Sequence, residues 1–248
     1  MRNRSFQFLI AAMLVFTTAA ARELSGASAP VHPSRVPAAP SFLDFRIYLP
    51  ITVYRDFAST TILPNDTWFI SSLGSLHVVG EVSNDTRYHL GSVKVSASLL
   101  DRNGQILRTE SAYTYLDFIP AGQKTCFDIT FLEPPSSWDA IDLKAPNYTL
   151  DGKVLPAAPI LNTSGEYVKD SGDYIISGQV RNDQGSRING VKPVGTLYNP
   201  AEKVIGCELT YVESMNLNPG AISSFKIDFY GRNYKDVNSF RVQVDGDY

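Results

Sequence analysis

Histidines and clustered acids, which most often bind metals or catalyse proton transfer, are sparse in this chain. The three histidines, His32, His77 and His89, lie far apart and lack the short spacing of a zinc site. The sequence contains no Gly-x-Ser-x-Gly motif, no His-Glu-x-x-His motif and no phosphate-binding glycine loop. We therefore predict no catalytic residues, no cofactor and no metal.

Two close pairs of acids are the remaining candidates for glycoside cleavage, which needs two carboxyl groups about 5–10 Å apart. They are Asp139 with Asp142 and Asp245 with Asp247. Neither pair is repeated elsewhere in the chain, and neither adjoins a predicted cleft. The sequence does not favour hydrolysis.

Three aromatic residues are candidate interaction residues: Trp68, Tyr115 and Trp138. Exposed aromatic rings could stack on a glycan, and packing at a strand edge is the alternative. Tyr113, in contrast, is assigned to the core. A groove lined by these three aromatic residues and a pair of carboxylates would favour carbohydrate binding.

The chain contains an internal repeat with an offset of 98 residues. Residues 80–131 share 13 identities with residues 178–229, without a gap. The Asn-Asp dipeptide is part of this match, at Asn84-Asp85 and Asn182-Asp183. Its side chains could bind a cation, but a turn in which they bond to nearby backbone groups is the favoured interpretation.

Hydrophobic residues in each repeat alternate with a period of two, which indicates β-strands. Val78, Gly80 and Val82 are expected to face the core, with His77, Val79 and Glu81 on the outer face. The matching core positions are Val78, Gly80, Val82, Leu99, Phe127 and Ile129, and then Ile176, Gly178, Val180, Leu197, Phe225 and Ile227. No segment has the pattern of a capped amphipathic helix. Short strands with one apolar face predict antiparallel sandwiches.

The two cysteines, Cys126 and Cys207, match Ser224 and Thr109, so neither repeat has an internal partner for its cysteine. Alternation places Cys126 on an outer face and Cys207 in a core. A disulfide needs Cα atoms within about 7 Å. The sequence therefore predicts two free thiols, one buried and one accessible.

Several motifs carry a family resemblance. They are Gly-Glu-Val-x-Asn-Asp at residues 80–85, Val-Lys-Val-x-Ala-x-Leu-Leu-Asp at 93–101, and Pro-Ala-Gly before Phe-x-Ile-x-Phe. Both repeats resemble the FxLYD domain family, although Ala97 or Gly195 replaces the phenylalanine of the motif. The resemblance implies immunoglobulin-like sandwiches on secreted or surface proteins of bacteria, without catalytic residues. The expected fold is therefore all-β, with two tandem immunoglobulin-like antiparallel β-sandwich domains.

The N-terminal residues have the pattern of a targeting signal. Residues 1–21 combine two arginines, a short apolar run and small residues, which is typical of a secretory signal peptide; an uncleaved anchor is the alternative. Residues 22–42 are rich in Pro, Ala and Ser and are expected to form a spacer. We expect a secreted, extracellular protein with no membrane span after signal removal.

The expected domain boundaries follow from the repeat. The first sandwich spans residues 43–146 with its repeat core at 59–146, a linker covers 147–156, and the second sandwich spans 157–248. Residues 43–58, which have no copy, are expected to add an edge strand or an extended linker.

The expected function is a non-catalytic module, not an enzyme, that acts as a spacer or as a protein-interaction or adhesion unit. The alternative is a carbohydrate-binding or glycoside-processing accessory protein. The expected partner is an unidentified protein or a cell-surface glycan. The net charge of −3 argues against a nucleic-acid partner.

Overall fold

The described part of the protein is built entirely from β-strands and connecting loops. The computed structural model describes residues 60–152, 156 and 158–247. The described residues form antiparallel sheets in a sandwich-like fold and include no helix. The expected signal, the spacer and the strand expected within 43–58 lie outside the described residues.

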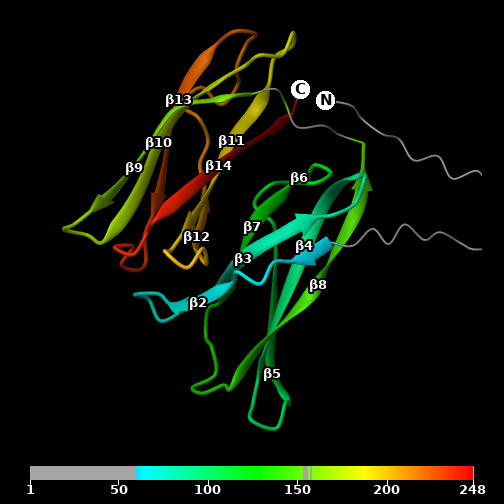
Figure 1. Cartoon of the computed structure of the whole chain (residues 1–248), viewed down its shortest axis with the longest axis vertical. Helices are drawn as coiled ribbons and strands as arrows, with labels where there is room; N and C mark the ends of the chain where they lie inside the picture. Colours follow the sequence, from blue (N-terminus) through cyan, green and yellow to red (C-terminus); the bar gives the residue numbers. More distant parts are fainter. Residues whose placement is uncertain (1–59, 153–155, 157, 248) are drawn as a thin grey trace, which may run out of the picture. The chain divides into compact units, whose positions relative to one another are not determined.

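The strands of the first repeat make two antiparallel sheets, drawn from cyan to green in Figure 1. One sheet contains β1 (Thr60–Ile62), β2 (Thr67–Ile70), β3 (Leu76–Asn84) and β7 (Lys124–Phe131). The other contains β4 (His89–Leu100), β5 (Ile106–Tyr113), β6 (Phe118–Ile119) and β8 (Ala140–Asp151). β8 pairs with β4 as far as Asp151, which lies in the range expected to link the repeats.

The strands of the second repeat make two further antiparallel sheets, drawn from yellow-green to red in Figure 1. One contains β9 (Ile160–Val168), β10 (Asp173–Arg181) and β13 (Ile222–Phe229). The other contains β11 (Asn189–Tyr198), β12 (Val204–Leu209) and β14 (Ser239–Asp247). Among the described strands, each sheet takes its members from one repeat only.

The predicted core positions are confirmed in both repeats. Each repeat has its own cluster of buried apolar side chains, which includes the aliphatic and phenylalanine positions predicted from the alternation. Gly80 and Gly178 are also buried at matching positions. A Cβ atom at Gly80 would lie 2.7 Å from the ring of Phe127, and one at Gly178 would lie 2.6 Å from the ring of Phe225. The repeated glycine therefore leaves room for the repeated phenylalanine.

The repeated Asn-Asp dipeptide forms a structural turn. The buried Asn84 side chain donates to the carbonyls of Tyr88 and Ile119 and accepts a bond from the Thr86 amide. The equivalent bonds of Asn182 join the carbonyls of Ser186 and Leu217 and the amide of Gln184, all within 2.8–2.9 Å. These asparagines satisfy backbone groups at the strand ends, as the favoured interpretation predicted.

The middle of the outer face of β3 is buried, although this face was expected to lie away from the core. Val79 and Glu81 have no exposed surface, although both alternate away from the core of the first repeat. A third cluster, which contains Cys126 and Leu116 from the first repeat and Val194 and Cys207 from the second, covers this side of the sheet. Alternation gave the direction of these side chains correctly but did not indicate what covers them.

The prediction of two free thiols is wrong. Cys126 and Cys207 form a disulfide, with Cα atoms 5.9 Å apart, and both are buried. Cys207 pairs across the sheet with Thr196, so it lies on the face of β12 that is turned away from its own core. The two sulfur atoms therefore meet where the second repeat covers the first.

A buried carboxylate provides a second link between the repeats. Glu81 of β3 accepts bonds from the Lys124 ammonium, the Tyr198 hydroxyl and the Arg241 guanidinium, each at 2.7 Å. Tyr198 and Arg241 belong to the second repeat. Burial opposes ionisation of Glu81, but these bonds together hold its pKa below the usual value.

Candidate functional site

The two tryptophans, Trp68 and Trp138, come together on the surface of the first repeat. Their ring centroids lie 5.7 Å apart and their planes cross at 75°, an edge-to-face arrangement. Trp68 is 53% exposed, while Trp138 is partly buried against the core of its repeat. The structure therefore brings together two of the three predicted interaction residues, which are 70 positions apart in the sequence.

The elements around the pair fix the position of each indole. Trp68 lies on β2 opposite Val78 of β3, and its neighbour Thr67 donates a hydrogen bond to the Val204 carbonyl of the second repeat. Trp138 lies in the loop before β8, where the Asp139 amide donates to the Leu100 carbonyl at 2.8 Å. Both tryptophans are thus attached to regular strands.

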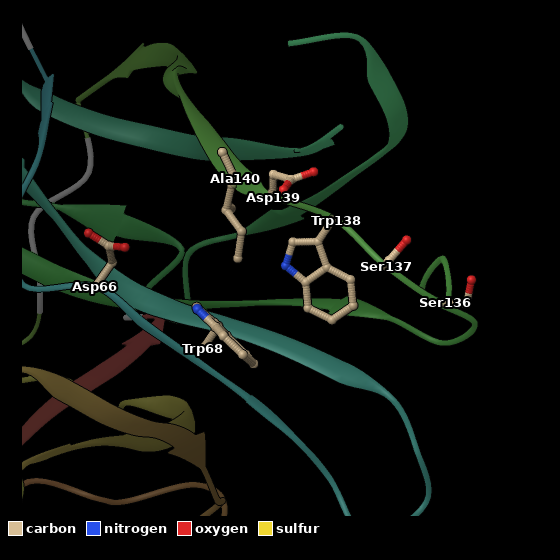
Figure 2. A pocket seen from close by; sticks show the side chains of 8 residues that line it. Asp66, Trp68, Ser136, Ser137, Trp138, Asp139 and Ala140 are labelled. Atoms are coloured by element: carbon tan, nitrogen blue, oxygen red, sulfur yellow. The ribbon is translucent and has the colours of Figure 1, made fainter. Parts of the chain in front are cut away.

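An open groove of about 550 Å³ lies beside the two indoles. Figure 2 shows the indoles facing this space, with Asp66 on one side and Asp139 on the other. Ser136 and Ser137 add hydroxyl groups to the lining. Within the part of the chain that the structure describes, the carboxylates of Asp66 and Asp139 have no hydrogen-bond or ion-pair partner. The groove thus combines aromatic surface with acceptors that the fold does not use.

Tyr115, the third predicted interaction residue, does not line this groove. It packs against the buried cluster around the disulfide, and burial raises its pKa above the usual value. Tyr113, which was assigned to the core, is 59% exposed, so the two tyrosines exchange their predicted environments. The structure therefore does not bring Tyr115 together with Trp68 and Trp138.

Neither of the two carboxylate pairs considered from the sequence has both of its members in the groove. Asp139 lines it, but Asp142 lies on β8 opposite Ser98. Asp245 is buried elsewhere, beside the Lys192 ammonium at 3.3 Å, and its burial raises its pKa. Asp66 is a lining carboxylate that the sequence did not single out; it directly precedes β2, two residues before Trp68.

A second group of titratable residues lies around His77, which was expected to face solvent. Its Nδ1 atom lies 2.9 Å from Asp128, and this hydrogen bond raises the pKa of His77. Thr130 also contacts Nδ1, at 3.3 Å. In a catalytic triad the acid and the hydroxyl contact different ring nitrogens, so these three residues do not form one. Burial raises the pKa of the nearby Glu208, from the second repeat, to about 7.

Two further properties describe the structured part of the chain. The described residues contain no group of three or more histidine, cysteine or acidic side chains that could hold a metal ion. Within the same residues, no helix has the length and apolar character needed to cross a bilayer.

Comparisons with known proteins give no family. No protein-family model and no curated protein matches the chain. Among solved structures, the exo-chitosanase CsxA of Amycolatopsis orientalis is 12% identical over 76% of this chain, with a TM-score of 0.27. Red sea bream transglutaminase is 10% identical over 75% of this chain, with a TM-score of 0.23. The chain spans 25% and 29% of these proteins, and likenesses this weak carry no argument about function.

Proposed function

We propose that the chain is a non-catalytic, extracellular binding module whose groove beside Trp68 and Trp138 receives a carbohydrate. The observation that carries this proposal is the pair of neighbouring indoles flanked by the unpartnered carboxylates of Asp66 and Asp139. The apolar face of a sugar ring stacks on an exposed indole, while carboxylates accept bonds from its hydroxyl groups. The groove volume of about 550 Å³ suits a ligand of one to a few sugar rings.

Binding is favoured over hydrolysis because of the surroundings of the two acids. A catalytic acid that stays protonated near neutral pH usually lies in a dry, apolar pocket. Asp139 is exposed and Asp66 is only partly buried, and the groove is open to solvent. These surroundings suit acceptors for sugar hydroxyls better than a proton donor to a glycosidic oxygen.

The proposed location and family extend the sequence expectations. A secreted protein with two FxLYD-like, immunoglobulin-like domains fits the signal-like N-terminus and the repeated motifs of the sequence. The disulfide between the repeats supports this location, because disulfides persist mainly in oxidising compartments.

A second candidate function is a rigid spacer or protein-interaction unit. The observation that favours it is the attachment between the repeats, through the disulfide and the Glu81–Arg241 ion pair at 2.7 Å. A fixed arrangement of two modules would suit the display of a partner-binding loop. This function needs no ligand in the groove.

Screening the secreted protein on a glycan array, followed by calorimetry with the best glycan, tests the proposal. We expect Trp68→Ala to weaken binding about tenfold or more, because it removes the stacking surface. Tyr113→Ala is the matched control, since Tyr113 is a similarly exposed aromatic residue on β5 outside the groove. An array without binding, or equal affinities for Trp68→Ala and the parent, would overturn the carbohydrate proposal.

A further inference from the structure

A second hollow lies between the two repeats, separate from the tryptophan groove. It also measures about 550 Å³, and its lining comes from both repeats. Asn65 and Lys124 belong to the first repeat, while Tyr198, Lys203 and Arg241 belong to the second. This volume lies in the range of small-molecule sites.

The lining of this inter-repeat pocket has an excess of positive charge. The lining holds three basic side chains, and two of them, Lys124 and Arg241, share an ion pair with the single buried carboxylate of Glu81, at 2.7 Å each. The Lys203 ammonium has no acidic partner among the described residues and donates to the Pro64 carbonyl at 2.6 Å. Glu81 itself does not line the pocket; Glu202 is the acid in the lining, and its side chain is exposed.

Arg241 has hydrogen-bond donors that the fold does not use. Its Nη2 atom donates to Glu81 and to the Lys124 carbonyl, but Nη1 donates to no described group. Its Nε atom is buried and has no partner. Guanidinium and ammonium donors around one hollow are the groups that proteins use to bind carboxylate or phosphate.

Neutral polar groups of the same pocket suit a ligand that also carries hydroxyl groups. The Oδ1 atom of Asn65 is a buried acceptor without a partner. Ser239 adds a hydroxyl group to the lining, and the Tyr198 ring adds apolar surface. A sugar that bears an oxyanion combines the charge, the hydroxyl groups and the apolar face that these residues match.

We propose that the pocket between the repeats binds an oxyanion-bearing sugar, a uronic acid or a sugar phosphate, with its anionic group between Lys203 and Arg241. Such a ligand would contact both repeats at once. This site is independent of the carbohydrate groove, because the two linings share no residue.

Calorimetry at constant ionic strength tests the proposal with three probes: D-glucuronate, D-glucose 6-phosphate and neutral D-glucose. We expect saturable binding of at least one anionic sugar, about tenfold or more tighter than that of glucose. A preference between the two anions assigns the oxyanion as carboxylate or phosphate. No saturable binding of either anion, or equal binding of glucose, would overturn the proposal.

A pair of matched variants locates the binding. Lys203→Met should weaken binding of the preferred anion about fivefold or more, because it removes a charged donor but keeps most of an unbranched side chain. Lys226→Met is the control; Lys226 lies on β13 outside the pocket and pairs with Asp228. If both variants lost the same affinity for the anion, the loss would come from the lower net charge of the protein, and the proposed site would be wrong. Trp68→Ala should leave this binding unchanged, and thermal unfolding of each variant verifies that it is folded.

Discussion

Cys126 of the first repeat and Cys207 of the second are covalently joined, although 81 positions separate them in the sequence. Each cysteine lies on the outer face of its own sheet, and the bond is buried between the repeats together with Leu116 and Val194. The disulfide therefore connects two cores that are otherwise built from separate sheets.

Removal of this disulfide should lower the stability of the protein while both repeats stay folded. We expect Cys126→Ala/Cys207→Ala to reduce the free energy of unfolding by about 2–4 kcal/mol, since closure of a long loop restricts the unfolded chain. Urea unfolding measures the change. Thiol titration of the denatured, unreduced parent protein should find no free thiol, and two thiols after reduction. Two thiols before reduction would contradict the pairing.

The repeated asparagines give a second prediction, because each satisfies three backbone groups. Asn84→Ala and Asn182→Ala should each lower the free energy of unfolding by about 1–3 kcal/mol, as two carbonyls and one amide lose their partner. Asn103→Ala, in an exposed turn, is the control and should change stability by less than about 0.5 kcal/mol. Neutral effects at the two buried positions would argue against the structural role of the dipeptide.

The repeated buried glycines give a third prediction. Gly80→Ala and Gly178→Ala should each destabilise the protein by about 1–3 kcal/mol, because the added Cβ would lie 2.7 Å or 2.6 Å from a core phenylalanine ring. Gly152→Ala is the matched control, since a Cβ there meets no atom within 4 Å. Chemical denaturation of the three variants checks the prediction, which fails if all three unfold at the same denaturant concentration.

Sequence reasoning predicted the sheets and cores because the evidence for them is local or repeated. Alternation and the offset of 98 residues identified Val78, Phe127 and their counterparts as core positions. The same alternation could not predict that Val79 and Cys126 are buried too, because a period of two separates the faces of a strand without indicating what covers the second face.

The candidate groove was predictable only in part. The residue types of Trp68 and Trp138 suggested binding, but their contact depends on long-range pairing of β2 with β3 and on the loop before β8. Tyr115 was a candidate for an exposed aromatic residue, but it packs against a buried cluster that includes Val194 and Cys207 of the second repeat. The face of Cys207 follows from its pairing with Thr196, beside a register shift between Leu197 and Tyr198 that alternation along the sequence does not indicate.

The groups around His77 predict that stability falls as the pH rises from about 5.5 to 7.5. The hydrogen bond to Asp128 raises the pKa of His77, so its stabilising effect is complete below pH 6.5 and is lost as the pH rises through the folded value. Burial raises the pKa of Glu208 from 4.5 to about 7. The free energy of unfolding therefore falls as the pH rises between these two values, because the unfolded chain loses this proton more readily than the folded protein. Both effects have the same sign because the folded protein holds more protons than the unfolded chain.

Urea unfolding at several pH values and fixed ionic strength measures this slope and its origin. Glu208→Gln should flatten the decline between pH 5.5 and 7.5, because the amide does not ionise. Glu110→Gln is the matched control: Glu110 occupies the equivalent position of the first repeat but pairs with Arg108 near the surface, so this variant should keep the slope of the parent. A parent protein whose stability rises over this range, or a Glu208→Gln variant with an unchanged slope, would show that Glu208 does not control the pH dependence of folding.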